Sequence, residues 1–587
     1  MNGPRKPYPL MEDFLHPVRT GGHGQHIKQI YNLYAYFWRF ALWKVFEQDP
    51  GRGGVLCFIT ASSYLQGPAF AGMREHIRRV ADEVYILDLG GEGRGAIREE
   101  NVFNIQTPVA IALVARYGPE DRQKPARVLY HRLAATTREG KLEELAALTS
   151  LKGIPFREAP VEWQAPFFPE AGGEWATWPR LIDLFPWHHS GVQFKRTWPI
   201  GPTREILEQR WNVLLQAPPG ERPWLFREER DRKVERQYPA VHSPARLPPL
   251  SDLKPENPPE AILPYGYRSF DRAWAIVDGR VCSYPRPPLW HTWGEKQVYL
   301  TSLLAGSLGK GPALTTSAYV PDLDHFHNRG GRVFPLYRDR EAQHPNLTQG
   351  LLEPLGKTYG FFVSPEEFAA YVYAVLAHPA YTKRFTEELR TPGPRVPLTK
   401  DPSLFRRGVA LGSELLWLHT YGERYGQGRS WSAFRGKARW SKAPSAYPTG
   451  HSYDPATQTL QVGDGEVREV APEVYGFEVS GFFPVRSWLG YRQRQRRGRS
   501  SSPLDGIVPA DWTPELGREL LELLWVLEGT LAVYPEQARL LEGILGGALF
   551  KAEELPTPSE EERQPPGEAD PEDPGEAQQV ELLSPTG

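Results

Sequence analysis

The chain has 587 residues, enough for about three domains of ordinary size. Hydrophobic residues make up 40% of the chain and aromatic residues 12%, which is sufficient for sizeable cores. No run approaches the roughly 18 apolar residues of a membrane span, and the amino terminus lacks the apolar core of a signal peptide. We therefore expect a cytoplasmic protein in a reducing compartment, with no membrane segment. The two cysteines cannot form a metal site by themselves, and we expect none.

The net charge of −2 conceals an uneven distribution along the chain. Residues 553–587 contain 11 acidic residues and one basic residue, a balance of −10 that leaves +8 for residues 1–552. A mildly basic body is compatible with phosphate binding, although +8 is modest for its length. The acidic, Pro-rich end predicts a disordered tail over 553–587.

The first part of the chain has the pattern of an α/β unit. Apolar runs at 54–60, 83–89 and 108–115 are bounded by Gly and Pro and predict strands that are buried on both faces. A helix is expected at 69–80, between the first two strands, and Cys57 would lie in a core strand. Because ligands bind at strand ends in α/β sheets, the chemistry is expected there.

These elements and their order carry a family resemblance. An aromatic-rich helix over 32–46 begins with Asn-Leu-Tyr and precedes Gly-Gly-Val-Leu-Cys-Phe-Ile-Thr at 53–60, after which come Tyr-Ile-Leu-Asp-Leu and Asn-Val-Phe. The series resembles the last third of an adenine-N6 DNA methyltransferase domain, most closely that of the type ISP restriction-modification enzymes. The resemblance implies a partial Rossmann-like α/β methyltransferase sheet over 26–118, after a flexible lead-in at 1–25.

From residue 175 the chain resembles the type ISP specificity region, to which it would be joined by a connector at 119–174. The resemblance implies a large α+β target-recognition domain over 175–552. Periodic apolar residues predict helices within it at 368–376, 408–421 and 514–533. The motifs that carry the resemblance lie at 183–192, 266–274, 284–287, 333–337 and 477–481.

The resemblance also indicates what the sequence lacks. Family members carry a Gly-rich S-adenosylmethionine loop and an Asp/Asn-Pro-Pro-Tyr/Phe catalytic loop upstream of this helix, and neither precedes Asn32. The chain is therefore expected to be the carboxy-terminal half of a larger or split enzyme and to be inactive alone. Its implied partners are double-stranded DNA and an amino-terminal methyltransferase half on a separate chain, with a helicase-nuclease as a further candidate. S-adenosyl-L-methionine would be the cofactor of the complete enzyme.

Two motifs imitate the missing loops. Asp88–Gly95 follows an apolar strand as a cofactor loop does, but such a loop opens directly into a helix, for which the sequence before the next strand leaves no room. A hairpin-like connection is the preferred interpretation, and a complete methyltransferase that uses Asp88–Gly95 stays open. Asn257-Pro-Pro is followed by Glu260 instead of an aromatic residue, which favours a linker. A non-catalytic DNA-binding specificity subunit or relic is the third alternative.

The resemblance assigns roles to four residues of the first part. Phe103 matches the aromatic residue that stacks on the flipped adenine, a contact that replaces the stacking lost by an extruded base. A core position for Phe103 is the equal alternative. Asn32, Tyr34 and Phe37 match the helix that borders the cofactor pocket.

Two further clusters have candidate chemistry. Asp322-Leu-Asp-His-Phe-His327 has metal-ligand residue types, but without a further ligand elsewhere an exposed loop is expected. Arginines crowd the stretch after residue 485, and guanidinium forks fit phosphate oxygens or the acceptor edge of guanine. A solvated loop is the alternative there. The candidate DNA-binding residues are Arg486, Arg492, Arg494, Arg496, Arg497 and Arg499.

Overall fold

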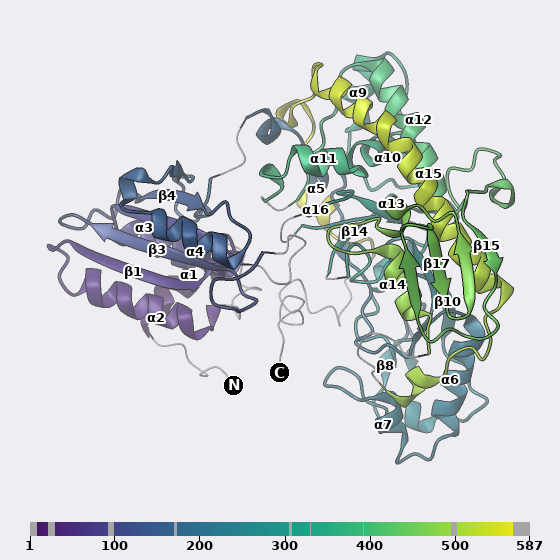
Figure 1. Ribbon diagram of the computed structural model, residues 1–587. Coiled ribbons are helices and arrows are strands. Elements are labelled where there is room, and N and C mark those ends of the chain that lie inside the picture. Colours follow the sequence, from purple (N-terminus) through teal and green to yellow (C-terminus); the bar gives the residue numbers. More distant parts are fainter. Residues whose placement is uncertain are drawn as a thin grey trace. The chain divides into compact units, whose positions relative to one another are not determined.

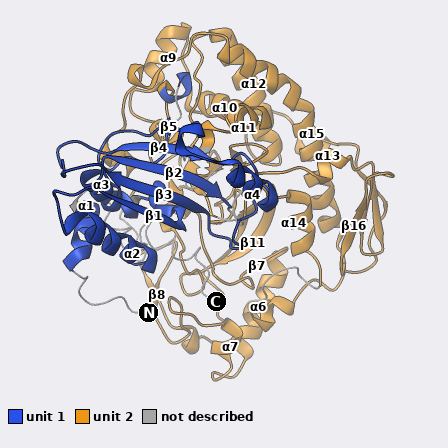
Figure 2. Cartoon of the chain, turned by 60° about the vertical axis from the view of Figure 1, so that its left-hand side comes forward, with its two compact units in different colours: residues 1–176, 574–587 blue, residues 177–573 orange. Residues whose placement is uncertain are grey.

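The chain forms two compact units in the computed structural model. Unit 1 comprises residues 1–176 and 574–587, and unit 2 comprises residues 177–573 (Figure 2). Both are mixed α/β, which confirms the predicted class at this level. No helix among the described residues is both long and apolar enough to cross a membrane. The structure describes residues 9–20, 30–91, 99–169, 173–304, 308–328, 330–390, 393–494 and 502–567.

Unit 1 is built on a five-stranded sheet of order β1-β3-β2-β4-β5 (Figure 1). Strand β3 pairs antiparallel with both β1 and β2, so β1 and β2 run parallel with β3 between them. Helix α3 joins these two parallel strands, and β4 pairs parallel with β2. The strands are β1 Gly54–Ala61, β2 Glu83–Gly90, β3 Val109–Arg116, β4 Arg127–Arg132 and β5 Arg157–Glu158, and the helices are α1 Glu12–Thr20, α2 Leu33–Leu42, α3 Ala71–Val80 and α4 Arg138–Ala147.

Helices α1, α2 and α3 pack on one face of this sheet. Leu56 of β1, Val84 of β2 and Val114 of β3 point toward them and share a core with Trp38 of α2. Helix α4 packs on part of the opposite face, where Leu145 shares a small hydrophobic cluster with Leu87 and Ile111. On β1 this opposite face is not covered, and alternate side chains of the strand are exposed. The prediction that β1 is buried on both faces is therefore wrong.

The described residues of unit 2 form four small antiparallel sheets. Their strand orders are β10-β11-β7, β13-β12-β14-β6, β15-β18-β17-β16 and β8-β9. The strands are β6 His189–Ser190, β7 Ile200–Gly201, β8 Tyr238–Pro239, β9 Arg246–Leu247, β10 Ala261–Arg268, β11 Asp271–Val277, β12 Tyr299–Ser302, β13 Thr315–Ser317, β14 Arg332–Pro335, β15 Arg439–Lys442, β16 His451–Asp454, β17 Thr459–Val462 and β18 Gly465–Arg468.

The three helices predicted in unit 2 pack together. Helix α10 is buried along its length from Phe368, and α12 approaches it so closely that a Cβ on Gly412 would lie 1.8 Å from the carbonyl oxygen of Ala370. Helix α15 packs on α12 and continues twelve residues beyond the predicted end. The helices are α5 Leu181–Leu184, α6 Arg204–Gln216, α7 Arg222–Phe226, α8 Pro287–His291, α9 Leu352–Tyr359, α10 Pro365–Leu376, α11 Pro379–Arg384, α12 Pro402–His419, α13 Pro472–Tyr475, α14 Pro484–Tyr491, α15 Pro514–Leu545 and α16 Glu560–Arg563.

The beginning of the acidic tail is ordered against unit 2. The Glu562 carboxylate accepts a hydrogen bond from the backbone N–H of Gln349 (2.7 Å), and Lys400 pairs with Glu554 (2.6 Å). Arg563 pairs with Asp183 at 3.2 Å. The prediction of disorder from residue 553 is therefore wrong up to residue 567, because these specific partners fix a segment whose composition alone favours disorder. Residues 568–587 lie outside the described part.

Candidate functional site

The carboxyl ends of the parallel strands β1, β2 and β4 lie at the same end of the unit 1 sheet. The loop that follows β1 and the loop that precedes β3 lie side by side at this end. A hydrogen bond joins them, from the backbone N–H of Ser62 to the carbonyl oxygen of Pro108 (3.0 Å). This end is where α/β sheets bind their ligands. The residues assigned to the cofactor border and to base stacking lie on segments that reach it.

The amino terminus of α2 contributes Asn32 and Tyr34 to this end. Asn32 caps the helix, with its side-chain oxygen accepting from the N–H of Tyr34 (3.5 Å). The Tyr34 ring stacks on Phe70, with ring centroids 5.8 Å apart, and burial raises the pKa of its hydroxyl. Phe37, one turn further along the helix, is 64% exposed. The predicted roles of these three residues at a cofactor pocket stay predictions.

Phe103 is presented outward by a loop that is held from within. The side-chain oxygen of Asn101 accepts from the N–H of Phe103 (2.8 Å), and its Nδ2 donates to the carbonyl of Thr107 (2.8 Å). Asn104 adopts the left-handed conformation, with φ of 57°, which turns the chain after the ring. The side chain is 51% exposed, so it belongs to the surface rather than to the core. An exposed ring on a fixed loop is what base stacking requires.

The Gly-rich connection after β2 is flanked by two acidic residues, Asp88 and Glu99, that both bind Arg132 of β4. The Asp88 carboxylate accepts from the Tyr130 hydroxyl (2.6 Å) and from Arg132 (2.7 Å), and Arg132 also binds Glu99 (2.8 Å). Gly90 has a φ of 58°, and a Cβ there would lie 2.0 Å from a Glu99 oxygen. Residues 92–98 are outside the described part, and the described residues that follow form no helix before β3. These pairs lock the start of the loop onto β4.

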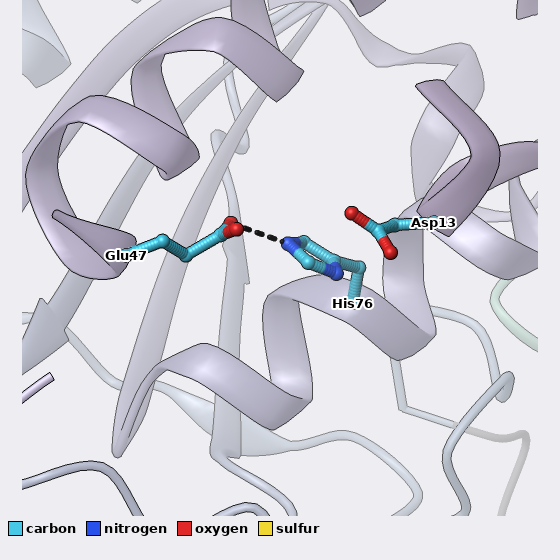
Figure 3. Close-up of side chains that lie close together, drawn as sticks. All are labelled: Asp13, Glu47 and His76. Atoms are coloured by element: carbon cyan, nitrogen blue, oxygen red, sulfur yellow. Dashed lines mark hydrogen bonds and ion pairs between the residues drawn. The ribbon is translucent and has the colours of Figure 1, made fainter. Parts of the chain in front are cut away.

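Asp13 of α1, Glu47 of the π-helical segment Trp43–Glu47 that follows α2, and His76 of α3 lie close together (Figure 3). The Nε2 atom of His76 lies 2.8 Å from a Glu47 oxygen, and the buried Arg39 binds both Glu47 and Asp13. Burial alone would raise the pKa of Glu47, but the hydrogen bonds from His76 and Arg39 lower it to about 2. Because the Arg39 guanidinium already supplies the positive charge, the cluster is a structural clamp.

The arginine-rich stretch divides into a buried and an exposed part. Arg492 is buried, pairs with Asp271 on β11 (2.8 Å) and lies 4.1 Å from the centroid of the Trp488 ring. Arg486 is exposed over the ring of Phe483 (4.4 Å), and the exposed Arg494 donates to the carbonyl of Ala510 (3.0 Å). Arg492 therefore belongs to the core, although the sequence had placed it among the candidate DNA-binding residues. Arg496, Arg497 and Arg499 lie outside the described residues.

The segment 322–327 is a buried polar network and not the exposed loop that was predicted. Asp322 accepts from Arg268 (2.8 Å) and from the Tyr265 hydroxyl (2.7 Å). The Nδ1 atom of His325 lies 3.0 Å from the Thr301 hydroxyl, and burial lowers the pKa of His325 to about 3. Arg268 and Tyr265 lie on β10, more than 50 residues before Asp322, which is why the local sequence could not indicate burial.

Sequence reasoning missed one surface altogether, the outward side chains of β1 and α2. Val55, Cys57 and Ile59 alternate along β1 and are all exposed, as are Leu33 and Phe40 on α2. The sequence signal for this surface was an apolar helix without a polar face next to an apolar strand. The α/β pattern led us to interpret the apolar residues of both elements as buried.

Comparisons with known proteins cover both units. The family model for the type ISP C-terminal specificity domain matches residues 183–523, and no curated protein sequence matches the chain. Because unit 2 makes up about two thirds of the chain, a structural match over 90% must include most of unit 1.

Three solved structures share the fold at 17–19% sequence identity. A cryo-EM structure of a DrdV–DNA complex matches with a TM-score of 0.62 and 19% identity, over 90% of this chain and 54% of that one. A nuclease-deletion mutant of the type ISP enzyme LlaGI with a DNA substrate mimic matches with a TM-score of 0.59 and 17% identity, over 91% and 42%. The ATP-dependent type ISP enzyme LlaBIII bound to DNA matches with a TM-score of 0.63 and 17% identity, over 92% and 36%. The chain thus spans about half or less of the length of these proteins.

Proposed function

Since the chain belongs to the type ISP family through its C-terminal specificity domain, we propose that unit 2 recognises a target sequence in duplex DNA. The single observation that carries this proposal is the family match over residues 183–523, which confirms the predicted resemblance. The three solved neighbours, each described with DNA, support it. The exposed guanidinium groups of Arg486 and Arg494 are of the kind that contact phosphate.

The test of this proposal is equilibrium binding of the whole chain to duplex DNA at increasing salt. We expect the logarithm of the affinity to fall linearly with the logarithm of the salt concentration, as counterions are released from each neutralised phosphate. Selection from a random duplex library should then enrich one sequence. Binding that is absent at low salt, or that enriches no sequence, would contradict the proposal.

We further propose that unit 1 is the end of a Rossmann-like, adenine-specific DNA methyltransferase domain. Its support is the parallel pair β1 and β2 joined through α3, with Asn32, Tyr34 and Phe103 on segments that reach the carboxyl end of the strands. Phe103 would stack on the flipped adenine, and Asn32, Tyr34 and Phe37 would border the S-adenosylmethionine pocket. The acceptor-positioning loop would come from the amino-terminal part of the methyltransferase domain, so residues 1–587 alone would not transfer methyl groups.

Calorimetric titration of S-adenosylmethionine into the whole chain separates this proposal from a complete methyltransferase that uses Asp88–Gly95. We expect no heat of binding for the chain alone, since Asp88 and Glu99 are engaged by Arg132. Cofactor binding without a partner would favour the complete enzyme.

A non-catalytic specificity subunit is the second candidate, because unit 2 holds the family match while the sequence has no Asn-Pro-Pro-Tyr/Phe loop. It predicts that no partner chain restores methyl transfer.

A further inference from the structure

Helix α7, at the lower end of unit 2 in Figures 1 and 2, presents a tryptophan to solvent. All 18 tryptophans of the chain lie among the described residues, and of these only Trp224 is exposed, with 67% of its surface accessible. The next two residues, Leu225 and Phe226, are buried in the core of unit 2. The indole is therefore carried outward by a helix whose other side is anchored.

The side chain of Arg222 fixes this helix from inside. It is buried and donates to the carbonyl of Leu215 in α6 (2.7 Å) and to the carbonyls of Leu250 (2.9 Å) and Leu253 (3.0 Å). Because these bonds come from two separate segments, the position of α7 does not depend on the exposed ring. Trp224 can therefore be substituted without loss of the fold.

The acidic residues that follow α7 are engaged by partners of their own unit. The Glu228 carboxylate accepts from a backbone N–H further along the segment (2.8 Å). Glu229 pairs with the buried Arg196 (3.1 Å), and Asp231 accepts from Lys195 (2.5 Å). These three carboxylates therefore neutralise groups of the protein itself.

The arginines of the same segment face solvent. Arg227, Arg230 and Arg236 are exposed, and 73% of the Arg230 side chain is accessible. Arg230 pairs with Asp231 (2.9 Å), but Lys195 shares that carboxylate. Glu235 is the exposed acidic residue of the segment. A run whose charges nearly balance in the sequence therefore presents an excess of positive charge beside the exposed indole.

An exposed ring among guanidinium groups has the chemistry that binds nucleic acid. The guanidinium groups pair with phosphate oxygens, and the ring packs on a base or a sugar. Tryptophan and arginine also dominate many protein interfaces, but a protein partner would have to place carboxylates opposite the arginines. The excess positive charge favours a polyanion, on which phosphates recur at every step.

We propose that residues 222–236, the α7 segment, form a further DNA contact of unit 2. Trp224 packs against a base or sugar of the duplex, and Arg230 and Arg236 bind phosphates beside it. The inference rests on the proposed function, which places duplex DNA on unit 2. It adds a contact that lies more than 200 residues before Arg486 and that includes an aromatic side chain.

Substitution of the tryptophan in the whole chain tests the contact. Trp224→Ala should weaken binding to the selected duplex by roughly 10-fold, and the slope of log affinity against log salt should not change, because the ring is uncharged. Trp224→Phe keeps an aromatic face and should retain most of the affinity, which guards against a folding defect. Phe362→Ala removes another ring of unit 2 that is 82% exposed, and it should leave binding unchanged.

Substitution of the arginines tests the phosphate contacts. Arg230→Ala and Arg236→Ala should each lower the salt slope by about 0.9, since each removes one neutralised phosphate. Arg407→Ala, which removes an exposed arginine that pairs with Glu536 on α15, is the matched control and should leave the slope as it is.

The outcomes separate this inference from the proposed function. If the wild-type chain selects a duplex but Trp224→Ala binds it equally well, the α7 segment is no DNA contact and the proposed function stands. The same conclusion follows if Trp224→Ala keeps DNA binding and loses a copurifying polypeptide, because the surface would then hold a protein. If the wild-type chain binds no duplex at all, the proposed function fails, and this inference fails with it.

Discussion

Units 1 and 2 place apolar and charged side chains in opposite ways. Among the described residues, twelve of the fifteen large exposed hydrophobic side chains lie in unit 1, although unit 2 is more than twice as long. Unit 2 instead buries helix α10 from Phe368 to its end and holds charged pairs such as Arg492–Asp271 and Arg268–Asp322 inside. The exposed apolar surface of unit 1 follows from its sheet, which helices cover fully on one face and only partly on the other.

The comparison teaches that the two units have different degrees of independence. In unit 2, buried charges such as Arg492 and Arg268 pair with carboxylates from distant segments of the same unit. Unit 1 closes one face of its sheet with α1, α2 and α3 and leaves β1 open on the other. We therefore expect the stability of unit 2 to be sensitive to changes in its buried charged and polar groups. In unit 1, we expect substitutions on the exposed apolar surface to have little effect on the stability of the lone chain.

The largest expected effect is a difference in acid sensitivity between the units. Burial lowers the pKa of His325 and His419 to about 3 and that of His378 to about 4, all in unit 2. Unfolded histidine titrates near pH 6.5, so the unfolded state takes up protons first and stability falls as the pH drops below about 6.5. Each such histidine costs up to about 1.4 kcal/mol per pH unit. In unit 1 the lowered pKa of Glu47 gives stability that is lost only below about pH 4.5.

Hydrogen exchange followed by mass spectrometry resolves the two units. We expect peptides of α10 in unit 2 to lose protection between pH 6.5 and 4.5, before peptides of β2 in unit 1. His419→Gln, which can still bond to Tyr373 and Thr530, should move the unit 2 transition to lower pH. Loss of protection in unit 1 first would contradict the comparison.

A second prediction concerns the buried ion pair of unit 2. Asp271→Ala leaves the Arg492 guanidinium buried without its carboxylate, which costs about 3–5 kcal/mol in the free energy of unfolding. Glu208→Ala removes an exposed pair with Arg204 and should change it by less than about 1 kcal/mol. Urea unfolding followed by exchange in unit 2 peptides measures both. Equal effects would show that Arg492 is not held by Asp271.

How far the sequence predicts this molecule depends on the range of the interactions. The strands at 83–89 and 108–115 are found within a residue or two, because continuous apolar runs bounded by Gly and Pro determine them locally. Helix α15 runs twelve residues past its predicted end despite Pro535, since Leu540 and Ile544 pack in the core and offset the lost backbone hydrogen bond. Tertiary packing decided that boundary.

The candidate site divides in the same way. Phe103 and Asn32 could be singled out by resemblance, and the structure places both on segments at the carboxyl end of the sheet. Arg492 could not be assigned to the core from its neighbours, because its partner Asp271 lies 221 residues away. Nor could the exposed face of β1 be predicted, since an apolar run looks the same whether this chain or another chain covers it.

A third prediction compares the two sides of α2. Trp38→Ala removes a fully buried indole that donates to the Thr60 hydroxyl (3.1 Å) and should cost about 3–5 kcal/mol in the stability of unit 1. Phe37→Ala, at the adjacent position on the exposed side of the helix, should change it by less than about 0.5 kcal/mol in the lone chain. Exchange rates of the β2 amides measure the difference. A large cost for Phe37→Ala in the lone chain would mean that this side of α2 is part of the core of unit 1.

The smallest expected effect is on DNA binding by unit 2. Arg486→Ala and Arg494→Ala each remove an exposed guanidinium, and each should weaken binding by about 1 kcal/mol or less. If the lost contact is to phosphate, the slope of log affinity against log salt should fall by about 0.9 per arginine, and the preferred sequence should not change. Arg204→Ala, an exposed arginine of α6 that pairs with Glu208, is the matched control and should alter neither quantity. A change of preferred sequence would instead place the substituted arginine at a base edge, and an unchanged slope in both variants would move the DNA contact away from α14.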